Sequence, residues 1–402
     1  MLRQEQIAIV IDSQKESFVK KDRTLTRESL KDVPIFSSFA TMITGVRRCG
    51  KSTLLLQIIK DKYEQALYLN FEDLRLTGFE TNDLVRLHQE VVKRGLNVVC
   101  FDEIQLVQQW EVFVHQLLRE GYTVFVSGSN ASLLSKEMGT HLTGRHVSME
   151  LFPFSYTEYL SYVNSEADAI SLKAYLHTGG FPEYLKHGSE LILQNLLEDI
   201  LVRDIAVRHS IRDVDALKQL AIYLIANTGA LVSANKLINL FGIKSSATIL
   251  EYFAWLKDAY LIEFLPLFSY SIKVQTRNPK KVYAIDTGLI SATSTAFSDN
   301  TGHKLENLVY LHLRRKKTEL YYFKEKGECD FVSFSKGKAQ EVVQVCLRID
   351  DINFDREYNG LVAAMQAFGL NQGVIVTLDQ KDYFEKKGYV VKMIPAHEYL
   401  GS

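Results

Sequence analysis

One segment of the sequence has the residue types and spacing of a phosphate-binding loop. The segment Gly45-Val46-Arg47-Arg48-Cys49-Gly50-Lys51-Ser52 follows the pattern GxxxxGK with Ser or Thr next, between an apolar run and an amphipathic stretch. The glycines let the backbone curl so that consecutive N–H groups face phosphate oxygens, and the following helix start adds partial positive charge. Lys51 is expected to reach the β- and γ-phosphates of ATP, and Ser52 to bind Mg²⁺. The other predicted nucleotide contacts are Gly45, Arg48, Cys49, Gly50 and Thr53.

A second candidate is the acidic pair Asp102-Glu103, which ends the apolar run from Leu96. Loops gather at the carboxyl edge of a parallel sheet, so both carboxylates are expected near the phosphate loop. In that position Asp102 would hold the Mg²⁺ shell, and Glu103 would polarise the attacking water. The alternative is an acidic pair on the surface.

Three further positions carry weaker signals. Ser129 and Asn130 end the next apolar run, where a polar side chain would sense the γ-phosphate or orient water; the alternative is a helix-capping turn. Arg145 precedes the fifth run and has the chemistry of an arginine finger, acting in cis or on a neighbouring subunit. A solvated surface arginine is the alternative.

The elements that must position these residues are short apolar runs separated by helical patterns. The runs are Phe39 to Val46, Ala66 to Asp73, Leu96 to Glu103, Tyr122 to Ser129 and His146 to Pro153. The first four show little polar alternation, as in strands buried on both faces. Strand–helix alternation predicts an α/β fold with a parallel sheet.

After Pro153 the pattern changes, and it predicts further domains. Three helical patterns, Val214–Ala226, Ser233–Leu240 and Ser245–Asp258, precede two strand-like segments, SYSIKVQ and KVYAID, as in a winged helix. The last hundred residues form a second α/β pattern. The predicted division is an ATPase domain over 1–155, a helical segment over 156–210, a winged helix over 211–290 and a small α/β domain over 291–402.

Composition excludes several classes of protein. The 402 residues carry a formal net charge of -1, so any nucleic-acid surface must be a local patch. The four cysteines form no CxxC pair, which excludes the usual zinc-ribbon spacing and fits a reducing cytoplasm better than a disulfide framework. The N-terminus lacks the apolar core of a signal peptide, and no stretch has the length of a membrane span.

Motifs along nearly the whole chain resemble AAA-type ATP-binding proteins of bacteria and archaea that end in a domain of unknown function with a restriction-endonuclease-like fold. The quoted motifs are TGVRRCGKSTLL, YLNFEDLRL, FDEIQ, VSGSNASLL, LTGR, LFPFSYTEYL, GGFPEYL, RDI and GHKLENLVYLHLRR. The first and third are general to P-loop ATPases, and the others are more specific. The resemblance implies an ATPase of the additional-strand class, a helical segment, a winged helix and a nuclease-like end.

The nuclease-like end departs from the pattern that the resemblance implies. Glu306 on a helix and Asp330 on a strand match the first two acids, but Gln344 and Cys346 occupy the places of the Glu-x-Lys pair. A neutral amide binds Mg²⁺ poorly, and a thiol cannot replace an ammonium. Glu341 is a substitute acid, although its odd offset from Gln344 points it to the opposite face. The expectation is a degenerate site that binds without cleaving.

The winged helix is a candidate reader of DNA phosphates. Its third helix opens with Lys244, Ser245 and Ser246, and its wing carries Lys273, Arg277, Lys280 and Lys281. Because the third helix is mostly apolar and also carries acids, a role in packing against protein is the alternative. The sequence therefore favours a cytoplasmic ATPase that couples nucleotide state to DNA or a protein partner, or acts as a homo-oligomer. The other hypotheses are a DNA-processing nuclease and a slow regulatory switch.

Overall fold

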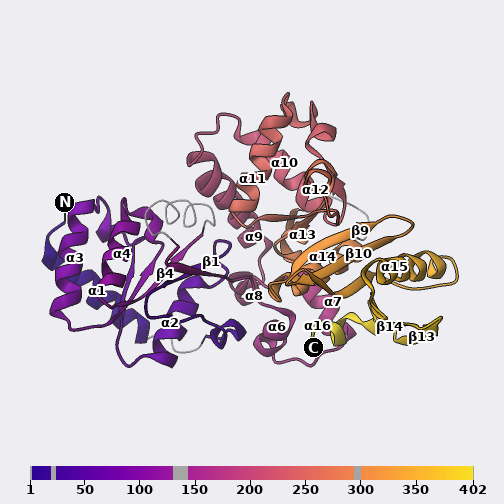
Figure 1. Cartoon of the computed structure of the whole chain (residues 1–402). Coiled ribbons are helices and arrows are strands. Elements are labelled where there is room, and N and C mark those ends of the chain that lie inside the picture. Colours follow the sequence, from indigo (N-terminus) through magenta and orange to yellow (C-terminus); the bar gives the residue numbers. More distant parts are fainter. Residues whose placement is uncertain (1, 20–23, 130–143, 294–299, 402) are drawn as a thin grey trace. The chain divides into compact units, whose positions relative to one another are not determined.

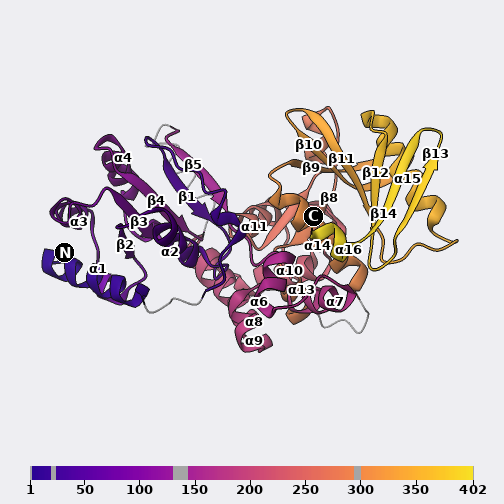
Figure 2. The same ribbon diagram turned by 90° about the horizontal axis from the view of Figure 1, so that it is seen from below.

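The computed structural model describes residues 2–19, 24–129, 144–293 and 300–401. These residues form two compact units (Figures 1 and 2). The first unit runs to Phe152 and includes Asp258–Tyr260, and the second contains Pro153–Lys257 and the chain from Leu261 onward.

A five-stranded parallel sheet forms the centre of the first unit, as the sequence predicts. Its strands lie in the order β2-β3-β4-β1-β5. Their bounds are β1 Ala40–Thr44, β2 Leu67–Asn70, β3 Val98–Asp102, β4 Thr123–Gly128 and β5 His146–Glu150. Strand β4 lies between β1 and β3, so an additional strand separates the phosphate-loop strand from the one that ends in Asp102.

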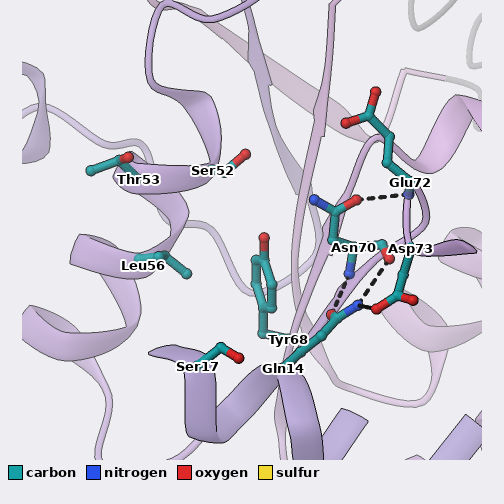
Figure 3. A pocket seen from close by; sticks show the side chains of 9 residues that line it. All are labelled: Gln14, Ser17, Ser52, Thr53, Leu56, Tyr68, Asn70, Glu72 and Asp73. Carbon is teal, nitrogen blue, oxygen red and sulfur yellow. Dashed lines mark hydrogen bonds between the residues drawn. The ribbon is translucent and has the colours of Figure 1, made fainter. Parts of the chain in front are cut away.

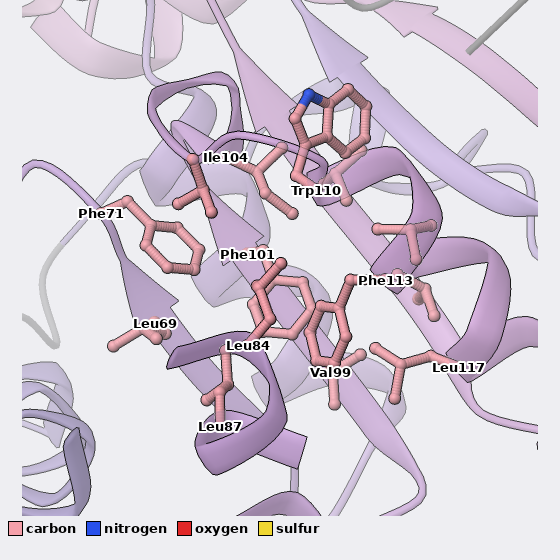
Figure 4. Packing of buried hydrophobic residues seen from close by; sticks show 14 of the residues in the cluster. Leu69, Phe71, Leu84, Leu87, Val99, Phe101, Ile104, Trp110, Phe113 and Leu117 are labelled. Atoms are coloured by element: carbon pink, nitrogen blue, oxygen red, sulfur yellow. The ribbon is translucent and has the colours of Figure 1, made fainter. Parts of the chain in front are cut away.

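Helices cover both faces of this sheet. The helices of the unit are α1 Gln4–Val19, α2 Lys51–Lys62, α3 Thr81–Lys93 and α4 Trp110–Arg119. Residues of α1, α3 and α4 share one apolar core with β2, β3 and β4, where Phe101 packs 5.8 Å from Phe113 between ring centroids (Figure 4). Helix α2 packs on β3 and β4 from the other face.

Strands β1 and β3 are buried on both faces, as expected, but β2 is not. Its side chains alternate: Leu67 and Leu69 are buried in the apolar core, whereas Tyr68 and Asn70 are half-buried on the opposite side. The expectation of little polar alternation is therefore wrong for this strand. Its polar face becomes part of the site described below.

The second unit begins with helices and a small antiparallel sheet. The helices are α6 Tyr156–Val163, α7 Ala169–Thr178, α8 Pro182–His187, α9 Glu190–Asp199, α10 Val214–Ala226, α11 Ser246–Asp258, α12 Ile272–Arg277 and α13 Thr287–Thr293, and a π-helix spans Ile200–Val207. The sheet has the order β6-β8-β7, with β6 Leu231–Val232, β7 Ile262–Leu265 and β8 Lys280–Ala284. Among the described residues, no helix is both long and apolar enough to cross a membrane.

Two expectations for this region are wrong. The segment Ser233–Leu240 contains a 3₁₀ turn over Ala234–Leu237 in place of a full helix. The segment SYSIKVQ forms helix α12 and not a strand. Strand β8 pairs with β6 on one side and β7 on the other, so it has no free edge for another strand.

A six-stranded mixed sheet forms the rest of the second unit, in the order β13-β14-β12-β11-β10-β9. The strands are β9 Glu319–Lys324, β10 Glu328–Ser335, β11 Lys338–Val345, β12 Gln372–Thr377, β13 Asp382–Lys386 and β14 Tyr389–Pro395. The helices are α14 Thr301–Arg315, α15 Phe354–Phe368 and α16 Ala396–Leu400. Helix α15 packs against β10, β11 and β12 over an apolar core.

A buried carboxylate joins distant segments of the second unit. Asp286, just before α13, accepts hydrogen bonds from the N–H of Gly180 at 2.7 Å and of Gly288 at 2.8 Å. Burial raises the pKa of Asp286 to about 7, and the N–H donors oppose that shift. Gly179 must be glycine because it has a φ of 67° and a Cβ there would lie 2.0 Å from Asp286 Oδ1. The Gly179-Gly180 motif is thus explained by the carboxylate packed against it.

We expect Asp286→Asn to lower the free energy of unfolding by about 1–3 kcal/mol, because the amide NH₂ would face one of the two N–H donors. Chemical denaturation checks this value. The control is Asp351→Asn, which changes an exposed aspartate of the same unit. Equal midpoints for the two variants would contradict the structural role given to Asp286.

Candidate functional site

The phosphate loop leaves β1 at Thr44 and ends where α2 begins at Lys51. Three of its residues have left-handed backbone: Gly45 at φ 149°, Arg48 at 62° and Gly50 at 104°. A Cβ at Gly45 would lie 2.1 Å from the carbonyl oxygen of Leu151, so only glycine fits there. The loop therefore has the tight curl that phosphate binding requires.

Lys51 is buried, and its ammonium lies inside this curl. Its Nζ donates to the carbonyl oxygens of Gly45 at 3.1 Å and Val46 at 3.2 Å. The Oε1 atom of Glu103 lies 3.8 Å from the same nitrogen. The lysine is thus held at the loop by weak neutral acceptors and one carboxylate.

Asp102 is fully buried at the end of β3, and neutral donors surround its carboxylate. Tyr68 Oη donates to Oδ2 at 2.7 Å, Asn70 Nδ2 donates to the same oxygen at 3.2 Å, and Ser127 Oγ donates to Oδ1. Burial, followed by the charge of Asp102, raises the pKa of Tyr68 well above its usual range. Tyr68 therefore remains a donor at neutral pH.

Glu103 follows with a positive φ of 53°, which is uncommon for a residue other than glycine. Its N–H donates to Ser127 Oγ at 3.2 Å, so Ser127 bridges Glu103 and Asp102. Sparsely populated backbone of this kind is often found at functional sites. Here it accompanies the approach of the Glu103 carboxylate to Lys51.

Arg27 holds the phosphate loop through hydrogen bonds to backbone carbonyls. Its buried guanidinium donates from Nη1 to the carbonyl of Cys49 at 2.8 Å and from Nη2 to the carbonyl of Phe152 at 2.7 Å. The Cys49 thiol donates to the Leu151 carbonyl at 3.3 Å, and burial raises its pKa. Cys49 is therefore an inert anchor of the loop.

A pocket of about 340 Å³ opens beside α2 and β2 (Figure 3). Its lining residues are Gln14, Ser17, Ser52, Thr53, Leu56, Tyr68, Asn70, Glu72 and Asp73. The side chains of Ser52 and Tyr68 border the same space in Figure 3. Because Tyr68 and Asn70 also bind Asp102, the pocket joins the start of α2 to the acidic end of β3.

The charges around this pocket suit a divalent cation. Burial raises the pKa of Glu72, and the negative charges of Glu103 and Asp102 raise it further. The positive charges of Arg47 and Lys51 lower the same pKa but do not cancel the rise. A hydroxyl from Ser52 and carboxylate oxygens are the hard ligands that Mg²⁺ prefers. Within the described ranges, no group of three or more His, Cys, Asp and Glu side chains is placed to hold a metal by itself.

Comparisons with known proteins agree with this geometry. A family model described as an AAA domain matches residues 37–160, and one described as a domain of unknown function matches residues 170–300. An uncharacterized protein of Methanocaldococcus jannaschii is 34% identical over 94% of this chain and 91% of its own length. An uncharacterized protein of Haemophilus influenzae is 31% identical over 78% of this chain and 84% of its own length.

The chain belongs to the same family as these two proteins. Its AAA domain contains the phosphate loop, Asp102 and Glu103, and supports an ATPase-type function.

The structure brings most of the predicted site residues of the AAA domain to one sheet edge. Ser129 is buried directly after β4, which pairs with β1 as far as Gly128 and Thr44. Asn130 lies outside the described residues. The Arg145 carbonyl accepts the N–H of Ala40, at the opposite end of β1. Four steps of strand, about 13 Å, separate that end from the loop, so Arg145 is not brought to the phosphate loop of its own chain.

Sequence reasoning missed four contributors to this site. Tyr68 and Asn70 were visible only as polar residues alternating with Leu67 and Leu69. Arg27 precedes Cys49, its partner in the loop, by 22 residues and lies in a stretch without any motif. Gln14, on a helix that was not predicted, donates to the Asn70 carbonyl at 3.2 Å and to Asp73 at 3.0 Å.

The predicted nuclease-like residues meet in part, in the second unit. Glu306, Asp330 and Gln344 line one pocket, but Cys346 is absent from its lining and donates instead to the Arg348 carbonyl at 3.1 Å. Glu341 accepts a hydrogen bond from Tyr399 and does not line the pocket either. Lys281, expected in an exposed wing, is buried in this pocket, so its assignment as a phosphate contact is wrong.

We expect Arg27→Met to lower the free energy of unfolding of the first unit by about 1–3 kcal/mol, because the carbonyls of Cys49 and Phe152 lose charge-assisted donors. Arg119→Met, an exposed change in α4, is the control. Because Trp255 lies in the second unit, both variants are made in a Trp255→Phe background, where denaturant unfolding followed by the fluorescence of Trp110 reports on the first unit. Coincident unfolding curves for the two variants would contradict the stabilising role given to Arg27.

Proposed function

We propose that the protein is an Mg²⁺-dependent ATPase that couples nucleotide state to the binding of DNA or of a protein partner. The observation that carries the proposal is the position of Lys51, whose ammonium lies in the loop curl and 3.8 Å from Glu103. The match of residues 37–160 to an AAA domain supports it.

Each residue of the loop has a role that its geometry supports. The N–H groups of the loop from Gly45 to Gly50, including those of Arg48 and Cys49, would hold the phosphates, and Thr53 borders the same pocket as Ser52. Ser52 and Asp102 are the proposed holders of Mg²⁺, which would neutralise phosphate charge when bound. Phosphate oxygens are stronger acceptors than peptide carbonyls, so Lys51 would exchange its bonds to Gly45 and Val46 for bonds to phosphate.

Glu103 is the proposed base that orients the attacking water. The hydrogen bond from its N–H to Ser127 fixes its backbone beside Asp102, and Ser129 lies one strand away as the proposed γ-phosphate sensor. Arg145 is proposed to act only on a neighbouring subunit of a homo-oligomer, because its position excludes its own loop.

The partner-binding part of the proposal concerns residues 211–290. The proposal of a winged helix is supported by the succession of α10, β6, a 3₁₀ turn, α11, β7 and β8, although α12 stands between the last two strands. Lys244, Ser245 and Ser246 precede or open α11, and the segment up to β8 carries Lys273, Arg277 and Lys280. These residues are the proposed DNA contacts. A protein partner is the alternative, favoured by the exposed apolar side chains of Leu250, Tyr270 and Ile272.

We expect Lys51→Ala to lower ATP affinity at least about tenfold, because the ammonium is the main mobile charge on the phosphates. Equilibrium binding of a fluorescent ATP analogue measures this loss. Lys62→Ala, at the exposed end of the same helix, is the matched control. Unchanged affinity in a folded Lys51→Ala protein would refute the nucleotide site.

We expect Glu103→Gln to retain ATP binding but slow hydrolysis by about 10²-fold or more, since the amide keeps the shape of the carboxylate without its basicity. Phosphate release under saturating ATP measures the rate. The control is Glu64→Gln, an exposed change in the same unit. A wild-type rate in Glu103→Gln would move the catalytic role to another residue.

A further inference from the structure

A pocket of about 650 Å³ in the second unit gathers charged and polar side chains from five elements. Strand β8 contributes Lys281, α14 Glu306, β10 Glu328 and Asp330, β11 Gln344, and α15 Glu357. Lys281, Asp330, Gln344 and Glu357 are each buried by more than nine-tenths. Burying so many ionisable groups is unfavourable unless each is paired, so the pairing decides what the pocket can bind.

The ammonium of Lys281 lies between the two predicted metal-binding acids. Its Nζ donates to Asp330 Oδ1 at 2.6 Å and to Glu306 Oε1 at 3.0 Å, and a Glu328 oxygen lies 4.0 Å away. Burial alone would lower the pKa of Lys281, but Asp330 and Glu306 raise it well above its usual range. The two hydrogen bonds place the ammonium of Lys281 in one site with both acids.

Other groups of the protein also donate hydrogen bonds to these acids. Tyr283, two residues after Lys281 on β8, donates from its hydroxyl to Glu306 Oε1 at 2.7 Å. The N–H of Val345 donates to Asp330 Oδ2 at 2.9 Å. Gln344, in the place of an acid, donates to Glu357 at 2.6 Å and accepts the N–H of Asp330.

This arrangement does not fit the divalent metal that a nuclease-like fold implies. Mg²⁺ requires oxygen ligands at about 2.0–2.1 Å in octahedral geometry, and a second cation held within hydrogen-bond distance of the same oxygens would repel it. Strand β8 is paired on both sides, which holds the lysine backbone in place. Although several carboxylates line the pocket, no three or more His, Cys, Asp or Glu side chains of the described residues are placed together so as to hold a metal ion.

We propose that Lys281 is the permanent cation of this pocket, standing where a divalent metal would otherwise bind Glu306 and Asp330. The pocket is consequently a metal-independent site that does not hydrolyse phosphodiesters. Its charge pair also ties β8 to α14 and β10, so the small antiparallel sheet and the large mixed sheet are joined by an ionic contact. The acid pair is a latent metal site that appears when the ammonium is removed.

The test measures Mn²⁺ binding to nucleotide-free, full-length protein by the loss of the free Mn²⁺ EPR signal. We expect Lys281→Met to bind Mn²⁺ about tenfold more tightly than wild type, and to gain thermal stability from Mn²⁺ that wild type does not gain. Lys281→Met with Asp330→Asn is the control, and it should lose both effects. Any Mn²⁺ bound by the AAA domain contributes equally to wild type and to all variants, so it does not affect the differences in Mn²⁺ binding between them. A folded Lys281→Met protein without this gain overturns the proposal.

A second comparison does not require Lys281→Met to fold. Wild type and Asp330→Asn are assayed for Mn²⁺ binding and for cleavage of plasmid and single-stranded DNA in Mg²⁺ and Mn²⁺. Equal Mn²⁺ affinities and no cleavage support the proposal. A Mn²⁺ site or metal-dependent cleavage that is present in wild type and lost in Asp330→Asn overturns it, and would make Lys281 part of a nuclease site.

Discussion

The AAA domain depends on one constraint: Lys51 and Asp102 are both buried at a sheet edge, so the protein must supply hydrogen-bond partners for both side chains. Two loop carbonyls hold the ammonium, and three neutral donors hold the carboxylate. The order of the strands brings the donors to Asp102. Strand β4, inserted between β1 and β3, brings Ser127 to Asp102, and the neighbouring strand β2 brings Tyr68 and Asn70 from the other side.

Among the described residues, the two buried lysines differ in the strength of their acceptors. Lys51 is held mainly by peptide carbonyls, which a phosphate oxygen would outcompete, so its bonds are exchangeable. Lys281 is held by two carboxylates in a site with little solvent, so its bonds are permanent. The same ammonium group is therefore suited to a changing ligand in one unit and to fixing structure in the other.

Sequence reasoning reached what is local along the chain. The phosphate loop, the acidic pair and each strand of the parallel sheet are defined within a few consecutive residues, and the sequence predicted the loop, the pair and the parallel sheet. Arg27, Tyr68 and Lys281 act through partners tens of residues away, and spacing carries no record of such contacts. The helix at Ile272–Arg277 was predicted as a strand because its apolar residues resemble one, but β8 offers no free edge to pair with.

The hydrogen bonds that Arg27 and Cys49 make behind the phosphate loop also have a consequence for the end of the first unit. Leu151 and Phe152 are the last residues before the chain passes into the second unit, and both are bound to the loop machinery. The Leu151 carbonyl contacts Cys49, and the Phe152 carbonyl shares the Arg27 guanidinium with Cys49. The last two residues of the first unit are therefore tied by hydrogen bonds to the loop machinery, so any change of the loop backbone at Cys49 acts first on the point where the first unit ends.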